Sequence, residues 1–168
     1  MSEASDTAWG DAIWDLMHGR DCSMLEVVVP WPRVPTVTPG GKVSKAKMAG
    51  KLIPWLSANV VNNLPAPVYR NYKIAWREAA EEARNNAGNR FRPLLSGPVE
   101  VLVKLWKPTA QEMDPLAVLE GLKPVVDGLE SSGLILNDRL VIGGWAEALK
   151  AASRDDCRVE VTLLAVAG

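Results

Sequence analysis

The sequence predicts a single α+β domain with one small mixed β-sheet and two main helices, in the order β-α-β-α-β-β. Two segments, 68–86 and 115–131, carry apolar residues at helical spacing. A third segment, 99–106, alternates apolar and other residues as a half-buried strand does. The chain has 168 residues, of which 48% are hydrophobic and 23% are charged. This length and composition suit one globular domain with a core of its own.

An acidic N-terminal extension, residues 1–23, is expected to precede the domain, which occupies residues 24–168. Within the extension, four apolar residues follow the spacing of a short amphipathic helix: Trp9, Ile13, Trp14 and Met17. The first strand is predicted at 25–29, and Pro30 ends it. Residues 32–66 are rich in proline, glycine, asparagine and lysine, which is typical of a loop. A loop of this length in a compact domain is usually functional or mobile.

The helix predicted at 68–86 has one apolar stripe, which consists of Tyr72, Ala75, Trp76, Ala79, Ala80 and Ala83. We interpret Trp76 as a core residue rather than a platform on which bases stack. The strand at 99–106 follows, after a Gly-Pro pair.

The C-terminal third supplies the remaining elements. The helix at 115–131 contains Pro124, which removes a backbone hydrogen bond, so we expect a kink near Gly121. Two strands are predicted next, at 140–149 and 158–166. We interpret the short segment between them as a hairpin-type connection.

The chemistry open to this chain is narrowed by its single histidine, His18, and its two cysteines, Cys22 and Cys157. A Ser-His-Asp triad, a Cys-His pair or a two-histidine metal site would each need His18, which lies in the extension. No CxxC pair is present, which excludes a zinc site, and we interpret both cysteines as free thiols. If the protein is an enzyme, its chemistry therefore depends on carboxylates, lysines or a metal bound by oxygen.

The N-terminus is acidic and lacks the basic and apolar regions of a signal peptide. No apolar run approaches the roughly 18 to 20 residues that a membrane helix needs. We therefore expect a cytoplasmic protein that makes no contact with a membrane.

Charge is distributed unevenly, although the formal net charge is only −1. Residues 1–26 contain six acidic residues and one basic residue, whereas residues 42–92 contain ten basic and three acidic ones. Such a basic region suits the phosphates of a nucleic acid. The residues predicted to bind nucleic acid are Lys42, Lys45, Lys47 and Lys51 in the loop and Arg70, Lys73 and Arg77 on the helix. The alternative interpretation is a solvated surface loop and helix face.

Four charged residues carry the main chemical signal: Asp114, Lys123, Asp127 and Asp138. Phosphodiester hydrolysis needs an activated water and a stabilised, doubly charged phosphorane. Mg²⁺ supplies both and prefers one or two carboxylates as protein ligands, and a nearby lysine can stabilise developing negative charge. Asp114 and Asp138 can share an ion only if the turn between the second helix and the next strand folds back.

Each of these residues also has a structural explanation. Asp114 before Pro115 is a good helix N-cap, worth about 1 kcal/mol. Lys123 and Asp127, four residues apart, suit a surface ion pair on a helix. Asn137-Asp138 suits a turn.

The segment DPLAVLEGLKPVVDGLESSGLILNDRLV resembles the signature of RusA-like Holliday-junction resolvases. In that family an Asp-x-Asp-Asn motif opens a helix, a lysine and an aspartate follow on the helix, and a second acidic cluster follows a glycine. Lys123 and Asp127 match this framework, as does Asn137-Asp138 after the glycine. Asp114-Pro115 resembles the Asp-Pro-x-Asn-Leu opening of some relatives. VVVPWP and WLSAN also resemble family segments, so the likeness spans residues 24–166.

The resemblance implies a RusA-like fold: a small α+β homodimer that binds four-way junctions and nicks them symmetrically. It implies Mg²⁺ as the cofactor, or Mn²⁺ in its place, with no small-molecule cofactor, in a bacterial or phage-infected cell. By position, it implies Asp114 and Asp138 as metal ligands and Lys123 as the cation beside the phosphate. Asp127 is implied as a further catalytic residue.

The chain departs from the family pattern in ways that reduce the number of carboxylates. Leu116 and Ala117 stand where the family has its second Asp and its Asn, and Asn137 stands where relatives pair two acids. Glu112 and Glu120 are candidate replacements. The first hypothesis is a junction endonuclease, and the second is a protein of the same fold that binds junctions without cutting them. The third is an unrelated binding module whose acidic extension docks a protein partner or covers the basic face.

Overall fold

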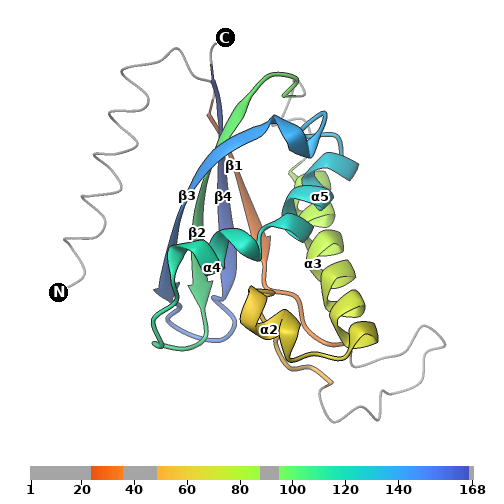
Figure 1. The fold of residues 1–168 in the computed structure, drawn as a ribbon, viewed down its shortest axis with the longest axis vertical. Coiled ribbons are helices and arrows are strands. Elements are labelled where there is room, and N and C mark those ends of the chain that lie inside the picture. Colours follow the sequence, from red (N-terminus) through yellow and green to blue (C-terminus); the bar gives the residue numbers. More distant parts are fainter. Residues whose placement is uncertain (1–23, 36–48, 88–94, 167–168) are drawn as a thin grey trace.

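The computed structural model describes residues 24–35, 49–87 and 95–166. It shows an α+β fold with one mixed, four-stranded sheet (Figure 1). The elements follow the chain as β1 (Met24–Pro30), α2 (Ala58–Asn62), α3 (Ala66–Asn86), β2 (Val99–Lys107), α4 (Pro115–Glu120), α5 (Lys123–Ser131), the 3₁₀ turn η2 (Asp138–Leu140), β3 (Val141–Lys150) and β4 (Arg158–Ala165). The predicted extension, residues 1–23, lies outside the described residues.

The strands lie in the order β1-β4-β2-β3, with β2 and β3 parallel and the other neighbours antiparallel. The predicted hairpin between the last two strands is therefore wrong, because β2 lies between β3 and β4. Burial gives the physical reason. Leu163 and Leu164 of β4 point to opposite faces and are both buried, as in a central strand. By contrast, Ile142 and Trp145 of β3 are 59% and 45% exposed although both are apolar, as on an edge strand.

The predicted helix at 115–131 is two helices, α4 and α5, rather than one kinked helix. Pro124 has no N–H to donate, and inside a continuous helix its ring would clash with the carbonyl of Glu120. Helix α4 accordingly ends at Glu120, with Gly121 at its C-cap. Gly121 packs directly against Trp55, where an added Cβ would be 2.1 Å from the indole Nε1. The interruption is therefore at Gly121, as expected, but it separates two helices instead of bending one.

Helices α3, α4 and α5 lie on one side of the sheet (Figure 1). Helix α3 packs on α5 and β1, and α4 packs on β3. The predicted apolar face of β2 is fully buried: Val99, Val101, Val103 and Leu105. Helix α5 also contacts η2, which leads into β3, so the start of β3 lies beside α5.

Three tryptophans form a cluster in the core, and Trp76 is fully buried, which confirms its interpretation as a core residue. The Trp76 ring lies edge-on to Trp31 and Trp55, with centroid separations of 5.1 and 4.8 Å. Each indole N–H donates to a backbone carbonyl, as buried tryptophans generally do: Trp31 to Ile53, Trp55 to Val118 and Trp76 to Pro54. These bonds connect the segment before α2 to β1's C-terminal flank, to α4 and to α3.

Candidate metal centre

Three carboxylates converge where α5 meets η2. Asp127 and Glu130 lie on α5, Asp138 begins η2, and one carboxylate oxygen from each lies within 4.8 Å of the others. All three residues are partly buried. This acidic group can hold a metal ion, because hard divalent cations take carboxylate oxygens as ligands.

The chain reverses direction after α5 at Gly133, whose φ of +80° glycine adopts at little cost. The N–H of Gly133 donates to the carbonyl of Glu130, and the N–H of Leu134 donates to that of Leu129. This pair of bonds is the Schellman motif that closes many helices. The reversal returns Asp138 to α5, where its N–H donates to Oε2 of Glu130 at 3.2 Å. The chain therefore folds back between α5 and β3, as a shared site requires.

Lys123 lies one turn before Asp127 on α5 and bridges the acidic group. Its Nζ donates to Asp127 and to Oδ2 of Asp138, the latter at 2.6 Å. Three carboxylates and one ammonium leave a formal charge of −2, which a divalent cation neutralises. The Lys123 side chain is 57% exposed, so an incoming phosphate can also reach it.

The contact between Lys123 and Asp138 shifts both pKa values. The hydrogen bond from Lys123 holds the pKa of Asp138 below its ordinary 3.8, although partial burial would raise it. Partial burial would lower the pKa of Lys123, but the hydrogen bonds and charges of Asp127 and Asp138 outweigh it and raise the pKa above 10.5. Both groups therefore stay ionised at neutral pH.

Replacing Lys123 by Met is expected to destabilise the metal-free protein modestly at neutral pH, because Asp127 and Asp138 then lose the ammonium that pairs with them. The folded pKa of Asp138 is depressed, so the ion pair stabilises the fold above pH 3.8 and this stabilisation is lost as pH falls through the lower, folded value. The difference in Tm between wild type and Lys123→Met should therefore shrink below pH 3.8. Thermal unfolding between about pH 3 and pH 8, without divalent ions, measures this difference. A difference that does not change with pH would contradict the prediction.

Asp114, the other predicted metal ligand, does not belong to the acidic group. Its side chain caps α4 and accepts a hydrogen bond from the N–H of Leu116 at 2.8 Å. It lines a surface hollow with Glu112 and with Ala148, near the end of β3. Asp138 precedes the start of β3, and the strand between these points is roughly 20 Å long at about 3.3 Å per residue. The placement of Asp114 supports the N-cap interpretation and does not bring it to an ion shared with Asp138.

Glu130 is the ligand candidate that sequence reasoning missed. Glu130 follows Asp127 by three residues, and residues at i and i+3 share a helix face. This spacing could have identified Glu130 as a neighbour of Asp127. The two glutamates considered as replacements lie elsewhere. Glu120 accepts a backbone hydrogen bond at the start of α2, at 3.0 Å, and Glu112 lines the hollow beside the start of α4.

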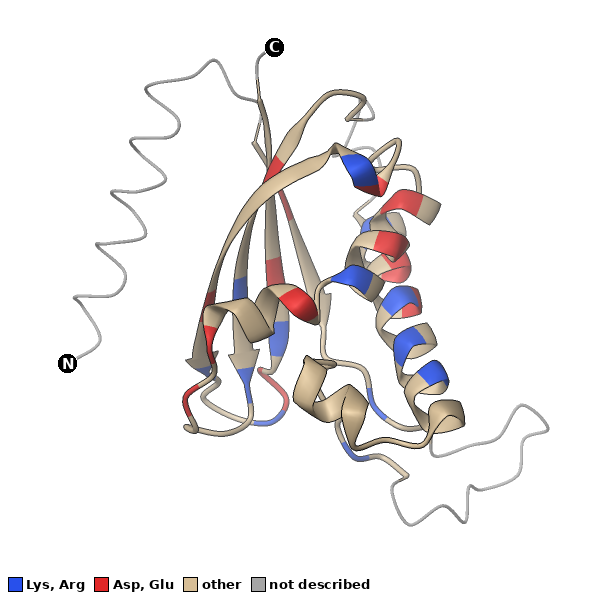
Figure 2. Ribbon diagram, in the orientation of Figure 1, with Lys and Arg blue, Asp and Glu red and all other residues tan. Residues whose placement is uncertain are grey.

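The described residues among the predicted DNA contacts are all exposed: Lys51, Arg70, Lys73 and Arg77. Lys42, Lys45 and Lys47 lie outside the described residues. The three on α3 recur at i, i+3 and i+7, so they share one helix face over about 10 Å. Figure 2 shows basic residues gathered in one half of α3. The backbone of Arg77 lies against Gly128 of α5, next to Asp127, so the basic face and the acidic group occupy neighbouring helices.

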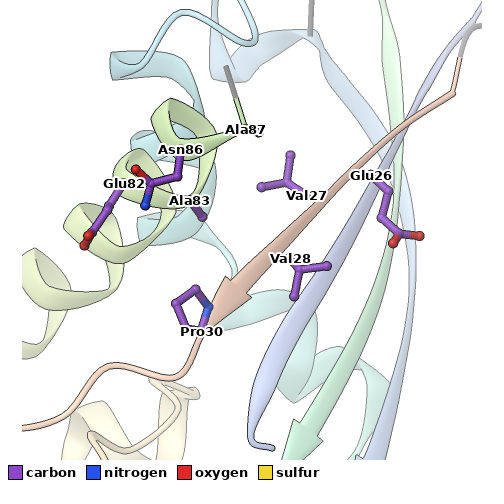
Figure 3. Close-up of a pocket in the computed structure, with 8 residues that line it drawn as sticks. All are labelled: Glu26, Val27, Val28, Pro30, Glu82, Ala83, Asn86 and Ala87. Carbon is purple, nitrogen blue, oxygen red and sulfur yellow. The ribbon is translucent and has the colours of Figure 1, made fainter. Parts of the chain in front are cut away.

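A separate hollow of about 470 Å³ lies between β1 and α3 (Figure 3). Val27 and Ala83 face each other across it in Figure 3. Its charged lining residues are Glu26 and Glu82, and none of the predicted site residues lines it. Two glutamates disfavour phosphate, so this hollow is a poor candidate for a nucleic-acid site.

Two comparisons with known proteins were without a match. No protein-family model matches this sequence, and no curated protein matches it. Within the described ranges, none of the helices combines the length and apolar character that crossing a membrane requires.

Proposed function

We propose that this protein is a Mg²⁺-dependent endonuclease that cuts four-way DNA junctions. The observation that carries the proposal is the acidic group of Asp127, Glu130 and Asp138, with one oxygen of each within 4.8 Å of the others. Lys123 donates to two of these carboxylates, which places a cation beside the candidate metal site. Carboxylate oxygens suit Mg²⁺, and Mn²⁺ in its place, better than softer metals. The sequence resemblance to RusA-like resolvases supplies the substrate class.

The residues of the site have separate parts in this proposal. Asp127, Glu130 and Asp138 would hold the ion, which when bound supplies charge stabilisation at the phosphate and activation of water. Lys123 remains protonated because its pKa is raised, and it can donate a hydrogen bond to a phosphate oxygen as negative charge develops. Asp127, on the next turn of α5, holds the ammonium in position.

The basic face of α3 is proposed to bind the DNA backbone beside the acidic group. The double substitution Lys73→Gln and Arg77→Gln removes two positive charges. Junction affinity should fall, and the slope of log affinity against log salt should decrease by about 2. Fluorescence anisotropy with a labelled junction, in Ca²⁺ and at several salt concentrations, measures the slope.

A matched control removes the same charge elsewhere. Lys150 is the last residue of β3 and Arg154 lies in the connection to β4; both are exposed, and neither belongs to α3. The double substitution Lys150→Gln and Arg154→Gln is expected to leave the salt slope almost unchanged. An equal slope in the two double variants would contradict the placement of the DNA on α3.

A homodimer is part of the proposal. A four-way junction has two symmetry-related cleavage points, and a C2 pair of subunits presents two matching sites. Paired nicks made within one binding event, together with a dimer mass by sedimentation, would support this arrangement.

The test of the proposed function is nicking of a synthetic four-way junction in Mg²⁺, in Mn²⁺ and in EDTA, beside a linear duplex of the same sequence. Metal-dependent paired nicks on the junction alone are the expected result. Equal nicking of the linear duplex would contradict selectivity for junctions. If the protein neither binds nor nicks the junction, a nucleic-acid function is rejected, and the remaining hypothesis is a module that binds a protein partner.

A second candidate function is junction binding without cleavage. Two observations favour it: Leu116, where the family has an acid, is 68% exposed and apolar, and Asp114 caps a helix away from the acidic group. Tight junction binding without nicking, in both Mg²⁺ and Mn²⁺, would establish this alternative.

A further inference from the structure

An apolar hollow of about 380 Å³ adjoins the acidic group, between the start of β3 and the helices α4 and α5. Lys123 and Asp138 line it, and its other lining residues are apolar or glycine, among them Val126 and Ile142. Its volume lies within the range of roughly 300–1,000 Å³ that is usual for small-molecule sites. The hollow therefore combines the charged residues of the candidate metal site with apolar walls.

The walls of the hollow come from closely packed elements. At Gly144, an added Cβ would lie 2.8 Å from Cγ2 of Val101 and 3.2 Å from Cδ2 of Leu119. The missing side chain thus lets α4 pack directly on β3 and close one side of the hollow. Ile142, in contrast to the tightly packed Gly144, is 59% exposed although it is apolar. It therefore presents an apolar surface at the edge of β3.

The edge of β3 adds hydrogen-bonding capacity. Within the described residues, β3 pairs only with β2, so alternate backbone N–H and C=O groups along its other edge point away from the sheet. Four residues of this edge strand, Val141 to Gly144, line the hollow, so the edge and the apolar walls adjoin. A ligand that has flat apolar faces and a polar edge suits this combination.

We infer that the hollow accepts one unstacked nucleobase, next to the phosphate that the acidic group and Lys123 would contact. The inference rests on the proposed function and adds to it a site for the base. A nucleobase offers faces for apolar contact and a hydrogen-bonding edge for the strand, and its own phosphate reaches the charged end. A branch point supplies such a base at low cost, because bases that are already unpaired or poorly stacked are the easiest to extrude.

The experiment places 2-aminopurine, in turn, at each nucleotide around the branch point of a four-way junction. Ca²⁺ replaces Mg²⁺, so that binding is observed without cleavage, and the nicked bond is mapped separately in Mg²⁺. Because 2-aminopurine fluoresces more strongly when it is unstacked, fluorescence should rise several-fold at one position beside the mapped phosphate. Aliphatic walls, unlike aromatic ones, preserve that rise.

Ile142→Ala removes part of the wall, and Val28→Ala is the matched control, because both are exposed β-branched residues on edge strands. Ile142→Ala should reduce the fluorescence rise and weaken junction binding roughly five- to tenfold, as expected for partial loss of an apolar base contact. Val28→Ala should leave both unchanged. Equal melting temperatures would show that the Ile142 variant is folded.

Three outcomes separate this inference from the function on which it rests. A rise at one position that is lost in Ile142→Ala supports the inference, whether or not the junction is nicked. Junction binding and nicking with no rise at any position, or with the same rise in Ile142→Ala, overturns the inference and leaves the proposed function standing. Failure of the wild-type chain to bind the junction rejects both.

Discussion

Replacing Asp138 by Asn, or Glu130 by Gln, is expected to reduce Mg²⁺-dependent nicking of a four-way junction by roughly a hundred- to a thousandfold. Each substitution removes one negative ligand from a group whose oxygens lie within 4.8 Å of one another, and each preserves the size of the side chain. The remaining group holds a divalent cation less tightly, so the developing charge on the phosphate is less stabilised. Single-turnover nicking rates, measured with the protein in excess, report this loss.

Asp114→Asn is the matched control, and it distinguishes two assignments of the metal ligands. Asparagine caps a helix about as well as aspartate, so α4 should be retained and nicking should change little. Junction binding in Ca²⁺ should persist in all three variants, which would locate the loss in the chemical step. If Asp114→Asn abolishes nicking and Glu130→Gln does not, the ligands implied by the family resemblance, Asp114 and Asp138, are correct, and Glu130 is not a metal ligand.

Gly128→Ala is expected to lower the stability of the fold by about 2–3 kcal/mol, or roughly 5–10 °C in Tm. Gly128 lies where α5 crosses α3, and an added Cβ would be 2.3 Å from the carbonyl oxygen of Arg77 and 2.8 Å from Cβ of Ala80. Neither atom can move without its helix, so the two helices must separate. This cost outweighs the gain of about 1 kcal/mol in helix propensity from Gly to Ala. Thermal and urea unfolding measure the change.

Gly97→Ala is the control for this substitution, because no atom other than those of Gly97 and its two chain neighbours lies within 4 Å of the added Cβ. Its stability should stay within about 0.5 kcal/mol of wild type. Gly128→Ala should also slow nicking, since Gly128 is the neighbour of Asp127 on the helix that also carries Lys123 and Glu130. A stability of Gly128→Ala equal to that of Gly97→Ala would contradict the close crossing of α3 and α5.

Most of the elements could be predicted from local patterns. The stripe of α3 and the alternation of β2 depend only on residue spacing, and the burial of Trp76 follows from its place on that stripe. The order of the strands could not be predicted in this way. β3 and β4 follow each other in sequence, but β4, in which alternate residues and also Leu164 are buried, takes a central position, whereas β3, in which no residue is fully buried, takes an edge. That choice depends on the packing of the whole sheet.

For the candidate site, the sequence by itself determined which chemistry is available. A single histidine and no CxxC pair leave carboxylates and lysines, and the four-residue spacing of Lys123 and Asp127 places them together on a helix. Only the tertiary structure decided which carboxylates meet. The reversal at Gly133 brings Asp138 to Glu130, while the length of β3 keeps Asp114 apart. Contacts within one helix follow from spacing, whereas contacts across a turn depend on how the chain packs on its way back.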